Sequence, residues 1–298
     1  MNHTQDIAYI RKRMENGEFP AHFLYGATGI PANGIEVVWH RSRLGLPRWR
    51  MMLRNAWLIL TSREHFDAVY ATHYRGLELI VLLRALRLFR RPVVIWHHQP
   101  VITSPGIWRE RFGRLFYRGF DRMIFFSQKL IDDSLRSPKA RPGGVVLGHW
   151  GADLRFYDRV MAAGTHERMG FISTGKELRD MPTLVKAFNR TGARLDIYTG
   201  RNTGGVNYEE VFAANPPAEN ITVHYVNGLC PYELSVKVDR AACVVICCKE
   251  TKYTVGLTTV VEALALGLPV ICSRNPQIPE DFDAEGCGIT VPYYDVDG

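Results

Sequence analysis

The sequence lacks the apolar segments of a membrane-spanning or exported chain. No apolar run approaches the ~18–20 residues that a membrane-spanning helix needs, and the longest candidate, residues 51–60, is interrupted by Arg54 and Asn55. The N-terminus has no apolar signal-peptide core. With 46% hydrophobic and 22% charged residues, the composition is that of a globular protein. We therefore expect a cytoplasmic protein.

Two cofactor signatures are also missing. All six cysteines lie after residue 229, and neither a Cys-x-x-Cys pair nor a histidine spacing suited to zinc accompanies them. Near the N-terminus, Gly26, Gly29 and Gly34 do not have the Gly-x-Gly-x-x-Gly spacing that cradles a dinucleotide. The Asp-x-Asp pair at the chain end, Asp295 and Asp297, lies outside any predicted site. We therefore predict no metal and no cofactor, and the glycine spacing argues against a nicotinamide-dependent oxidoreductase.

Acidic residues are scarce in the first half of the chain. Residues 1–150 hold 23 Lys and Arg against 11 Asp and Glu, a net charge of +12, whereas residues 151–298 hold 14 against 19, a net charge of −5. A chain of 298 residues exceeds the usual single domain, so we place one domain at 1–150 and a second at 151–298. The basic half predicts a partner that carries negative charge.

Basic and aromatic residues are most concentrated in residues 41–60. Among Leu and Met, this segment carries Arg41, Arg43, Arg48, Trp49, Arg50, Arg54 and Trp57. Such an amphipathic helix can lie on an anionic membrane surface, and a solvated basic face on an outer helix explains the pattern equally well. Nucleic acid is a third interpretation, but no nucleic-acid-binding motif accompanies the segment, so we expect no nucleic-acid partner. Peripheral contact with the inner membrane face stays open.

Strands and helices alternate along both halves, which predicts α/β domains with parallel sheets. The first half is expected to open with a strand at 7–10, a helix at 21–32 and a strand at 35–39. Later strands are predicted at 67–71, 93–96, 123–126 and 145–148 in the first half and at 171–174, 194–198, 221–225, 243–247, 270–272 and 289–292 in the second. Helices are predicted between them, including one that begins at Gln128 with Ser127 as its cap.

The clearest chemistry lies in residues 254–273, TVGLTTVVEALALGLPVICS. Gly256 opens a helix with Thr258 and Thr259 in its first turn, and a buried strand follows. Backbone N–H groups and hydroxyls at a helix N-terminus, with the helix dipole behind them, favour a phosphate. Glu262 lies one turn further along, where its carboxylate can accept hydrogen bonds from ribose hydroxyls. The alternative is an ordinary buried helix–turn–strand with one glutamate at its rim.

This stretch resembles the donor-binding signature of retaining glycosyltransferases with the GT-B fold (glycosyltransferase family 4-like, or glycosyl transferases group 1). The signature consists of two glutamates separated by seven residues, and those seven residues include a Gly-Leu-Thr. The resemblance implies two Rossmann-like domains with parallel sheets facing across a cleft. It also implies that residues 256–259 contact the donor diphosphate and that Glu262 contacts the ribose. The family's first glutamate, which holds the transferred sugar, is Thr254 here, and the nearest carboxylate, Glu250, lies four residues earlier.

Two other motifs agree with this resemblance. Lys176 and Arg179 lie in a predicted strand-to-helix loop that begins at Gly175, where two cations beside a helix N-terminus suit a diphosphate; a solvated loop with two surface cations is the alternative. The family carries a basic pair in this loop. His97 and His98 follow a predicted strand, and at most one of them faces the ligand edge because neighbours on a strand point in opposite directions. The family often keeps a donor-contacting histidine here, so either one is a candidate catalytic residue.

The joint between the halves also resembles the family, with Gly151, Asp153 and Phe156 in register and Asp153 expected to cap the next segment. Residues 225–229 are expected near the nucleotide base. The family's last helices are missing, so we interpret the chain as C-terminally short, either a fragment or a natural short form.

Together these patterns predict a glycosyltransferase that moves a sugar, with retention, from a nucleotide-diphosphate sugar to a glycan or lipid-linked acceptor on the basic half. The alternative is a nucleotide-binding module with little or no turnover, and a scaffold that binds polyanions or membranes through the basic half is a third hypothesis. The predicted donor site consists of Gly175, Lys176, Arg179, Thr254, Gly256, Leu257, Thr258, Thr259 and Glu262.

Overall fold

The computed structural model describes residues 6–40, 45–164, 167–226 and 230–298 of the chain. The fold divides into two compact units, Met1–Asn16 with Ala21–Trp150 (unit 1) and Gly17–Pro20 with Gly151–Gly298 (unit 2). The short segment Gly17–Pro20 belongs with unit 2 because Arg159 donates to Gly17 O (2.8 Å) and Tyr232 N–H donates to Glu18 O (3.0 Å). Arg41, Arg43 and residues 227–229, which carried predictions above, lie outside the described residues.

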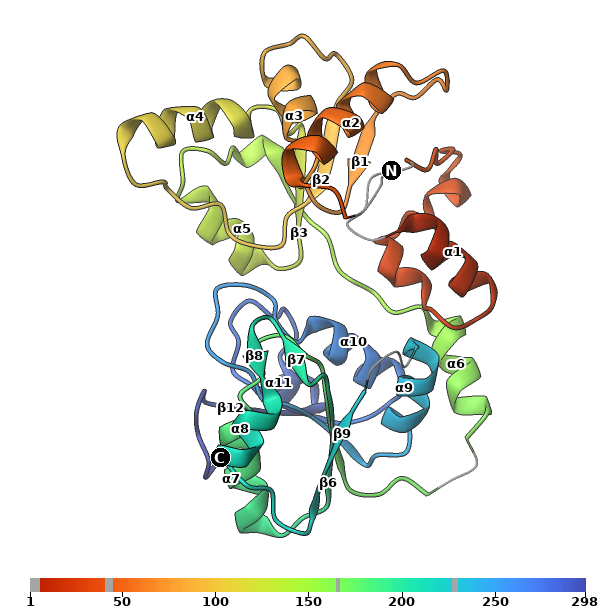
Figure 1. Cartoon of the computed structure of the whole chain (residues 1–298), viewed down its shortest axis with the longest axis vertical. Helices are drawn as coiled ribbons and strands as arrows, with labels where there is room; N and C mark the ends of the chain where they lie inside the picture. Colours follow the sequence, from red (N-terminus) through yellow and green to blue (C-terminus); the bar gives the residue numbers. More distant parts are fainter. Residues whose placement is uncertain (1–5, 41–44, 165–166, 227–229) are drawn as a thin grey trace. The chain divides into compact units, whose positions relative to one another are not determined.

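Unit 1 is built on a parallel sheet with the strand order β1-β2-β3-β4. Helix α3 packs against both α2 and α4, and α5 packs against β3 and β4 (Figure 1). The elements are α1 (Ile7–Glu15), η1 (Ala21–Leu24), η2 (Ile30–Asn33), α2 (Arg48–Leu60), β1 (Val69–Ala71), α3 (Glu78–Ala85), β2 (Val93–Trp96), α4 (Ile107–Tyr117), β3 (Arg122–Phe125), α5 (Gln128–Leu135), η3 (Pro142–Gly144) and β4 (Val145–Leu147).

The predicted β–loop–α–β opening of unit 1 is wrong. Residues 7–10 begin helix α1, because the Asp6 carboxylate caps it by accepting from Ala8 N–H (2.9 Å) and Tyr9 N–H (3.2 Å). Ile7 and Ile10 are buried at a helical spacing. The helix expected at 21–32 is two short 3₁₀ turns instead, and residues 35–39 form no strand.

Aromatic packing holds this irregular segment to the sheet of unit 1. The Tyr25 ring lies 4.8 Å from the Trp150 ring and 5.8 Å from the Trp96 ring. Trp96 stacks on Phe126 at 4.9 Å. The Tyr70 hydroxyl donates to Tyr25 O and accepts from Trp96 Nε1 (2.5 Å). Side-chain packing across the ends of β1 and β2 therefore fixes a segment that has little regular structure of its own.

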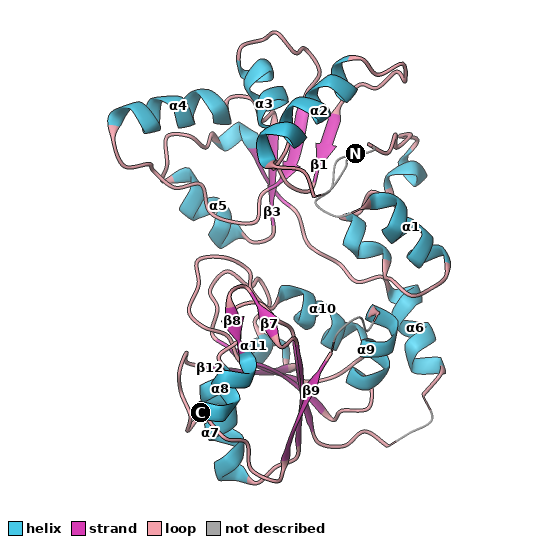
Figure 2. Cartoon of the chain, in the orientation of Figure 1, coloured by secondary structure: helices cyan, strands magenta, loops and turns pink. Residues whose placement is uncertain are grey.

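Unit 2 contains a larger parallel sheet with the order β12-β11-β10-β5-β6-β9. Counted from β5, this is the 3-2-1-4-5-6 order of a Rossmann fold. Helices cover both faces of the sheet (Figures 1 and 2). The elements are α6 (Leu154–Ala162), β5 (Phe171–Thr174), α7 (Met181–Thr191), β6 (Leu195–Thr199), β7 (Asn202–Thr203), β8 (Val206–Asn207), α8 (Tyr208–Ala214), β9 (Ile221–Tyr225), α9 (Pro231–Val238), β10 (Cys243–Ile246), α10 (Leu257–Ala265), β11 (Val270–Ser273), α11 (Phe282–Glu285) and β12 (Gly288–Val291).

The central strand β10 shows why unit 2 needs helices on both faces of its sheet. All four of its residues are buried, as in parallel strands covered on two sides. Val244 and Ile246 join a core formed with α6, α9 and α10, and Val245 joins the opposite core formed with α7 and α8. Alternate side chains along one strand therefore supply two separate hydrophobic cores.

Most of the predicted strands are confirmed. The strands predicted at 93–96, 171–174 and 221–225 have the observed bounds of β2, β5 and β9. Ser127 caps α5 by accepting from Leu130 N–H (3.3 Å), and Asp153 caps α6 by accepting from Phe156 N–H (3.3 Å). All six cysteines are free thiols, and Cys230, Cys243, Cys248 and Cys272 are buried. In the described part of the chain, no helix is long and apolar enough to cross a membrane.

Gly119 follows α4 and packs closely against Val81 of α3. Substitutions at this glycine therefore test the packing of the two helices. A Cβ added to Gly119 would lie 2.0 Å from the backbone oxygen of Val81, whereas one added to Gly143 would meet nothing within 4 Å. We expect Gly119→Ala to destabilise the protein by about 1–3 kcal/mol, the usual cost of overpacking, and Gly143→Ala to stay within about 0.5 kcal/mol. Urea unfolding followed by circular dichroism measures both, and equal midpoints would contradict the packing.

Candidate functional site

The loops that leave β5 and β10 are joined at the carboxyl edge of the unit 2 sheet. These strands are neighbours, and the strand order reverses between them, which marks the place where open α/β sheets bind ligands. Asp180 N–H donates to Cys247 O (3.0 Å) and Lys249 N–H donates to Leu178 O (2.9 Å). The loop that carries Lys176 and Arg179 is therefore fixed to the loop that leads into α10.

The Arg179 side chain lies at the centre of this arrangement and is 5% exposed. Its Nε donates to Thr174 O (3.0 Å) and its Nη1 to Glu177 O (3.3 Å). Nη1 also contacts Cys248 Sγ (3.2 Å), and Nη2 donates to Thr259 Oγ1 (3.1 Å). A guanidinium has five N–H donors, so among the described residues these four contacts leave one N–H on Nη2 without an acceptor. Arg179 is therefore mainly a link between β5, the loop after β10 and α10.

Two glycines permit the close approaches in this site. Gly175 has φ +107°, and a Cβ added there would lie 2.2 Å from Arg179 Nη2. Gly256 has φ +95°, and a Cβ added there would lie 2.8 Å from Ile246 Cγ2. Both backbone conformations disfavour residues with a side chain. The first glycine therefore makes room for the guanidinium, and the second lets α10 begin directly against β10.

The N-terminus of α10 presents backbone donors. Leu257 N–H donates to Thr254 O (3.3 Å) and Thr259 N–H to Gly256 O (2.9 Å). Among the described residues, no acceptor is found for the N–H groups of Gly256 and Thr258. The Thr258 side chain is exposed, whereas Thr259 is buried against Arg179. Two backbone donors and one hydroxyl at the positive end of a helix can bind an anion.

Glu262 lies one turn further along α10 and is bound to α9. It is partly buried, and its Oε1 accepts from the hydroxyl of Ser235 (2.5 Å). Burial raises the pKa of Glu262 to about 7, and the Ser235 hydrogen bond opposes that rise. The side chain therefore titrates near neutral pH. Its charged form can accept hydrogen bonds from two adjacent hydroxyls, whereas its protonated form can donate one.

Lys176 occupies the exposed side of the same sheet edge. Its backbone oxygen accepts from the Tyr208 hydroxyl (3.0 Å), and a Cβ added to Gly200 would lie 3.8 Å from its Cδ. The aliphatic part of the Lys176 side chain therefore runs beside the end of β6, and the residue is exposed. The next residue, Glu177, is acidic, and its carboxylate accepts from the Tyr253 hydroxyl (2.7 Å). That bond ties the β5 loop to the loop before α10.

The two histidines of unit 1 have different surroundings. His97 is 6% exposed, with Nδ1 2.6 Å from Gln99 O and Nε2 3.1 Å from the Tyr117 hydroxyl. A carbonyl oxygen can only accept, so Nδ1 carries the proton and Nε2 accepts from Tyr117. Burial lowers the pKa of His97 to about 4, although the Gln99 contact opposes the shift. His98 is partly buried and donates from Nε2 to Thr72 O (2.9 Å).

Both histidines line a pocket of about 670 Å³ at the carboxyl edge of the unit 1 sheet. Its other walls come from α4, from the loops after β1 and β2, and from the segment after α5. Lys139 lies in this wall at 6% exposure and is held by Glu110 Oε2 (3.1 Å), Ile102 O (2.7 Å) and Ser104 Oγ (2.6 Å). Lys139 is thus largely neutralised, and the exposed Arg109 supplies positive charge to the pocket.

The structure brings most of the predicted donor residues of unit 2 to one edge. Gly175, Arg179, Gly256 and Thr259 meet where β5 and β10 end, and Glu262 lies one turn away on α10. Sequence reasoning missed three participants, Ser235, Cys248 and Tyr253. Ser235 carries no sequence signal for contact with Glu262, because α9 and α10 meet only through tertiary packing.

Comparison with solved structures identifies the class of fold. A glycosyltransferase from Rickettsia africae superposes with a TM-score of 0.61 at 12% identity, covering 91% of this chain and 74% of that one. HepE from Anabaena, in complex with UDP, gives 0.59 at 12% identity, covering 89% and 75%. A trehalose-6-phosphate synthase from Burkholderia multivorans gives 0.61 at 12%, covering 84% and 65%.

These similarities extend over both units, and the chain has the GT-B fold. No protein-family model matches the sequence. A search of curated proteins also finds no match. The resemblance drawn from the sequence motifs is therefore confirmed at the level of the fold.

The contacts of Arg179 predict that it stabilises the protein more than Lys176 does. Arg179→Ala leaves the buried Thr259 hydroxyl and Thr174 carbonyl without their donor, and an unsatisfied buried group costs about 1–3 kcal/mol. We expect Arg179→Ala to lower the thermal midpoint by several degrees and Lys176→Ala to leave it unchanged. Scanning calorimetry of both variants measures this difference. An unshifted midpoint for Arg179→Ala would show that the network is not formed.

The raised pKa of Glu262 predicts a pH-dependent stability. A carboxyl with a raised folded-state pKa destabilises the fold at pH values above that pKa, and the penalty disappears as the pH falls below the unfolded value of 4.5. Glu262→Gln keeps an oxygen for Ser235 but cannot ionise. We expect this variant to melt at a higher temperature than the wild type at pH 8 and at nearly the same temperature at pH 4. A pH-independent difference would be inconsistent with a pKa near 7.

Proposed function

We propose that this protein transfers a sugar from a nucleotide-diphosphate sugar that binds at the carboxyl edge of the unit 2 sheet. The observation that carries the proposal is the joining of the β5 loop, the β10 loop and the α10 N-terminus by the Arg179 guanidinium. This junction puts one Nη2 hydrogen of Arg179 and two backbone N–H groups at one strand-order reversal. Such donors suit a diphosphate, and Glu262 one turn away suits the adjoining ribose.

The structural neighbours support a nucleotide sugar as the ligand. HepE is described in complex with UDP and with UDP-glucose, and a trehalose-phosphate synthase from Burkholderia xenovorans is described in complex with glucose-6-phosphate. At 12–14% identity these neighbours support the fold and the class of ligand, while the sugar and the base are left open. We infer a donor of the same general type for this chain.

The residues of unit 2 can stabilise the charge that develops as the sugar leaves the diphosphate. Fixed donors at a helix N-terminus need no reorganisation during the reaction, which is the condition for electrostatic catalysis. The exposed Lys176 adds a mobile positive charge. We infer retention of configuration from the motif resemblance, and an acceptor that is a glycan or a lipid-linked sugar bound to unit 1. His97 is 6% exposed, whereas His98 is only partly buried, so His98 is the better candidate for contact with a substrate.

A second candidate function is nucleotide-sugar binding without turnover. The position at which relatives carry a sugar-binding glutamate is Thr254, and this residue uses its backbone oxygen within the turn before α10. Glu250, the nearest carboxylate along the chain, is exposed. Binding of UDP-sugars with no transfer and no hydrolysis would favour this alternative over the transferase.

The proposal predicts a specific loss of nucleotide binding in one glutamate variant. Hydrogen bonds to a charged group are worth about 1.5–3 kcal/mol, so at pH 8 we expect Glu262→Ala to weaken UDP binding by about 10–100-fold. The matched control, Glu250→Ala, removes an exposed carboxylate from the preceding loop and should stay within about twofold. Isothermal titration calorimetry with UDP, GDP and ADP measures the affinities. Equal effects of the two substitutions would refute the placement of the ribose.

A further inference from the structure

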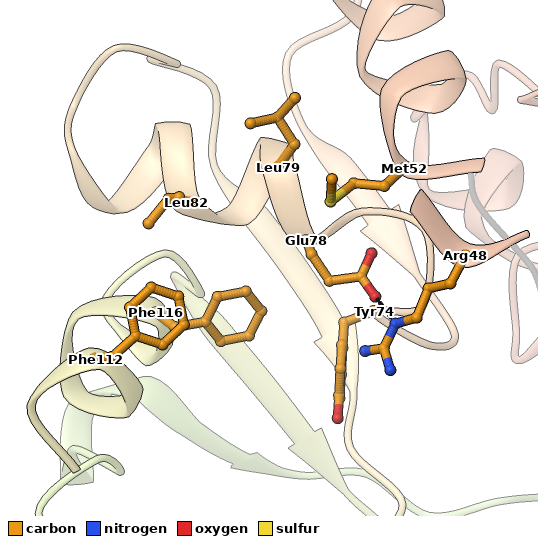
Figure 3. Close-up of a pocket in the computed structure, with 8 residues that line it drawn as sticks. All are labelled: Arg48, Met52, Tyr74, Glu78, Leu79, Leu82, Phe112 and Phe116. Carbon is orange, nitrogen blue, oxygen red and sulfur yellow. Dashed lines mark hydrogen bonds and ion pairs between the residues drawn. The ribbon is translucent and has the colours of Figure 1, made fainter. Parts of the chain in front are cut away.

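A second pocket in unit 1 is apolar over most of its surface. It has a volume of about 360 Å³ and lies between α2, α3 and α4 (Figure 3). Met52 comes from α2, Leu79 and Leu82 come from α3, and Phe112 and Phe116 come from α4. These side chains offer a ligand carbon and sulfur atoms only, so the pocket suits a hydrocarbon chain rather than a sugar.

The polar groups of this pocket are confined to one end. Arg48 Nε is bound to Glu78 Oε1 (2.6 Å), and Glu78 Oε2 accepts from Gly76 N–H (2.7 Å). Glu78 thereby holds the guanidinium in place and neutralises part of its charge. Within the described ranges, neither Nη atom of Arg48 has a hydrogen-bond partner, and its side chain is 60% exposed. A guanidinium held in this way can bind one phosphate through two N–H groups.

The apolar pocket adjoins the polar pocket that contains His97 and His98. Both are lined by Tyr74, Phe112 and Phe116. A ligand that occupies both therefore needs a hydrocarbon part, an anionic group near Arg48 and a polar part near the histidines. Amphiphiles that carry a hydrocarbon chain, a phosphate and a hydroxylated head supply these three parts.

The helices that wall the apolar pocket also expose apolar side chains to solvent. On α2, Trp49 is 57% and Trp57 68% exposed, and on α4 Trp108 is 76% exposed. Arg50 lies over the Trp49 ring (5.0 Å) and Arg111 over the Trp108 ring (5.4 Å). Exposed tryptophans paired with arginines are typical of surfaces that contact the interface of an anionic bilayer. This pattern of charge and exposed tryptophan indicates that the hydrocarbon in the pocket belongs to a lipid and not to a water-soluble apolar molecule.

We propose that the pocket between α2, α3 and α4 binds the hydrocarbon chain of an anionic lipid, with its phosphate on Arg48. Its role as the site of a lipid-linked acceptor rests on the proposed transferase function, but the binding itself does not. The exposed Trp49, Trp57 and Trp108 would contact the bilayer from which the lipid is taken.

Dodecyl phosphate below its micelle concentration is a suitable probe, measured by calorimetry against butyl phosphate and inorganic phosphate. Each methylene that enters the pocket should raise the affinity about threefold to fourfold, the change expected for ~0.8 kcal/mol per buried CH₂. Leu82→Trp fills the pocket and should lower the affinity for dodecyl phosphate at least tenfold. Leu79→Trp, on the same helix, should lower this affinity by a similar factor. The matched control is Leu86→Trp, at a position 48% exposed outside the pocket, which should bind like the wild type.

Arg48→Gln tests the anionic group separately. It should lower the affinity for dodecyl phosphate at least fivefold and leave the affinity for neutral dodecyl maltoside unchanged. Equal binding of dodecyl and butyl phosphate, or unchanged dodecyl phosphate binding in both tryptophan variants, would overturn the inference. So would a concentration-dependent dimer that both tryptophan variants abolish while alkyl phosphates fail to bind, because the pocket would then hold a second copy. UDP binding, measured on the same samples, reports on unit 2, so failure of this inference and failure of the proposed function give different results.

Discussion

The arrangement of unit 2 depends on one buried cation and its partners. The Arg179 guanidinium reaches the end of β5, the loop after β10 and the first turn of α10 through four contacts. A buried charge is tolerated only where hydrogen bonds satisfy it. Here two acceptors lie within five residues of Arg179, whereas Cys248 and Thr259 lie 69 and 80 residues further along the chain. The charge is therefore stable only when these segments meet. Burial of Arg179 therefore requires the three segments that form the proposed donor site to come together.

The sequence predicted the regular part of the fold well because that part follows local rules. Short β-branched runs such as those of β2 and β5 are buried along most of their length and are bounded by turn residues, so their limits are visible in the chain. The N-terminal segment failed because Ile7 and Ile10 fit both a strand and a helix. Only the Asp6 cap, confirmed by its contacts with two backbone N–H groups, distinguishes the two. The first 3₁₀ turn and Tyr25 after it are held by rings from distant segments, which no local pattern reveals.

The candidate site was predictable to a smaller extent, and for a physical reason. Glycines at positive φ and threonines in the first turn of α10 are local features, so the end of that helix proposed to bind phosphate could be recognised. Whether a cation faces solvent or the interior depends on its neighbours. Lys176 and Arg179 look alike in the sequence, yet one is exposed and the other is 5% exposed. Ser235 approaches Glu262 only because α9 packs beside α10 in the folded unit.

The opposite charges of the two halves do not correspond to their proposed ligands in a simple way. Residues 151–298 carry a net charge of −5, yet they form the site proposed for a diphosphate. That site depends on backbone donors and one buried guanidinium at short range, where local geometry outweighs a net charge spread over the surface. The net charge of +12 in residues 1–150 instead includes exposed arginines on α2 and α4. A diffuse field of this kind suits attraction to an extended anionic surface, whereas the fixed donors of unit 2 suit a single small anion.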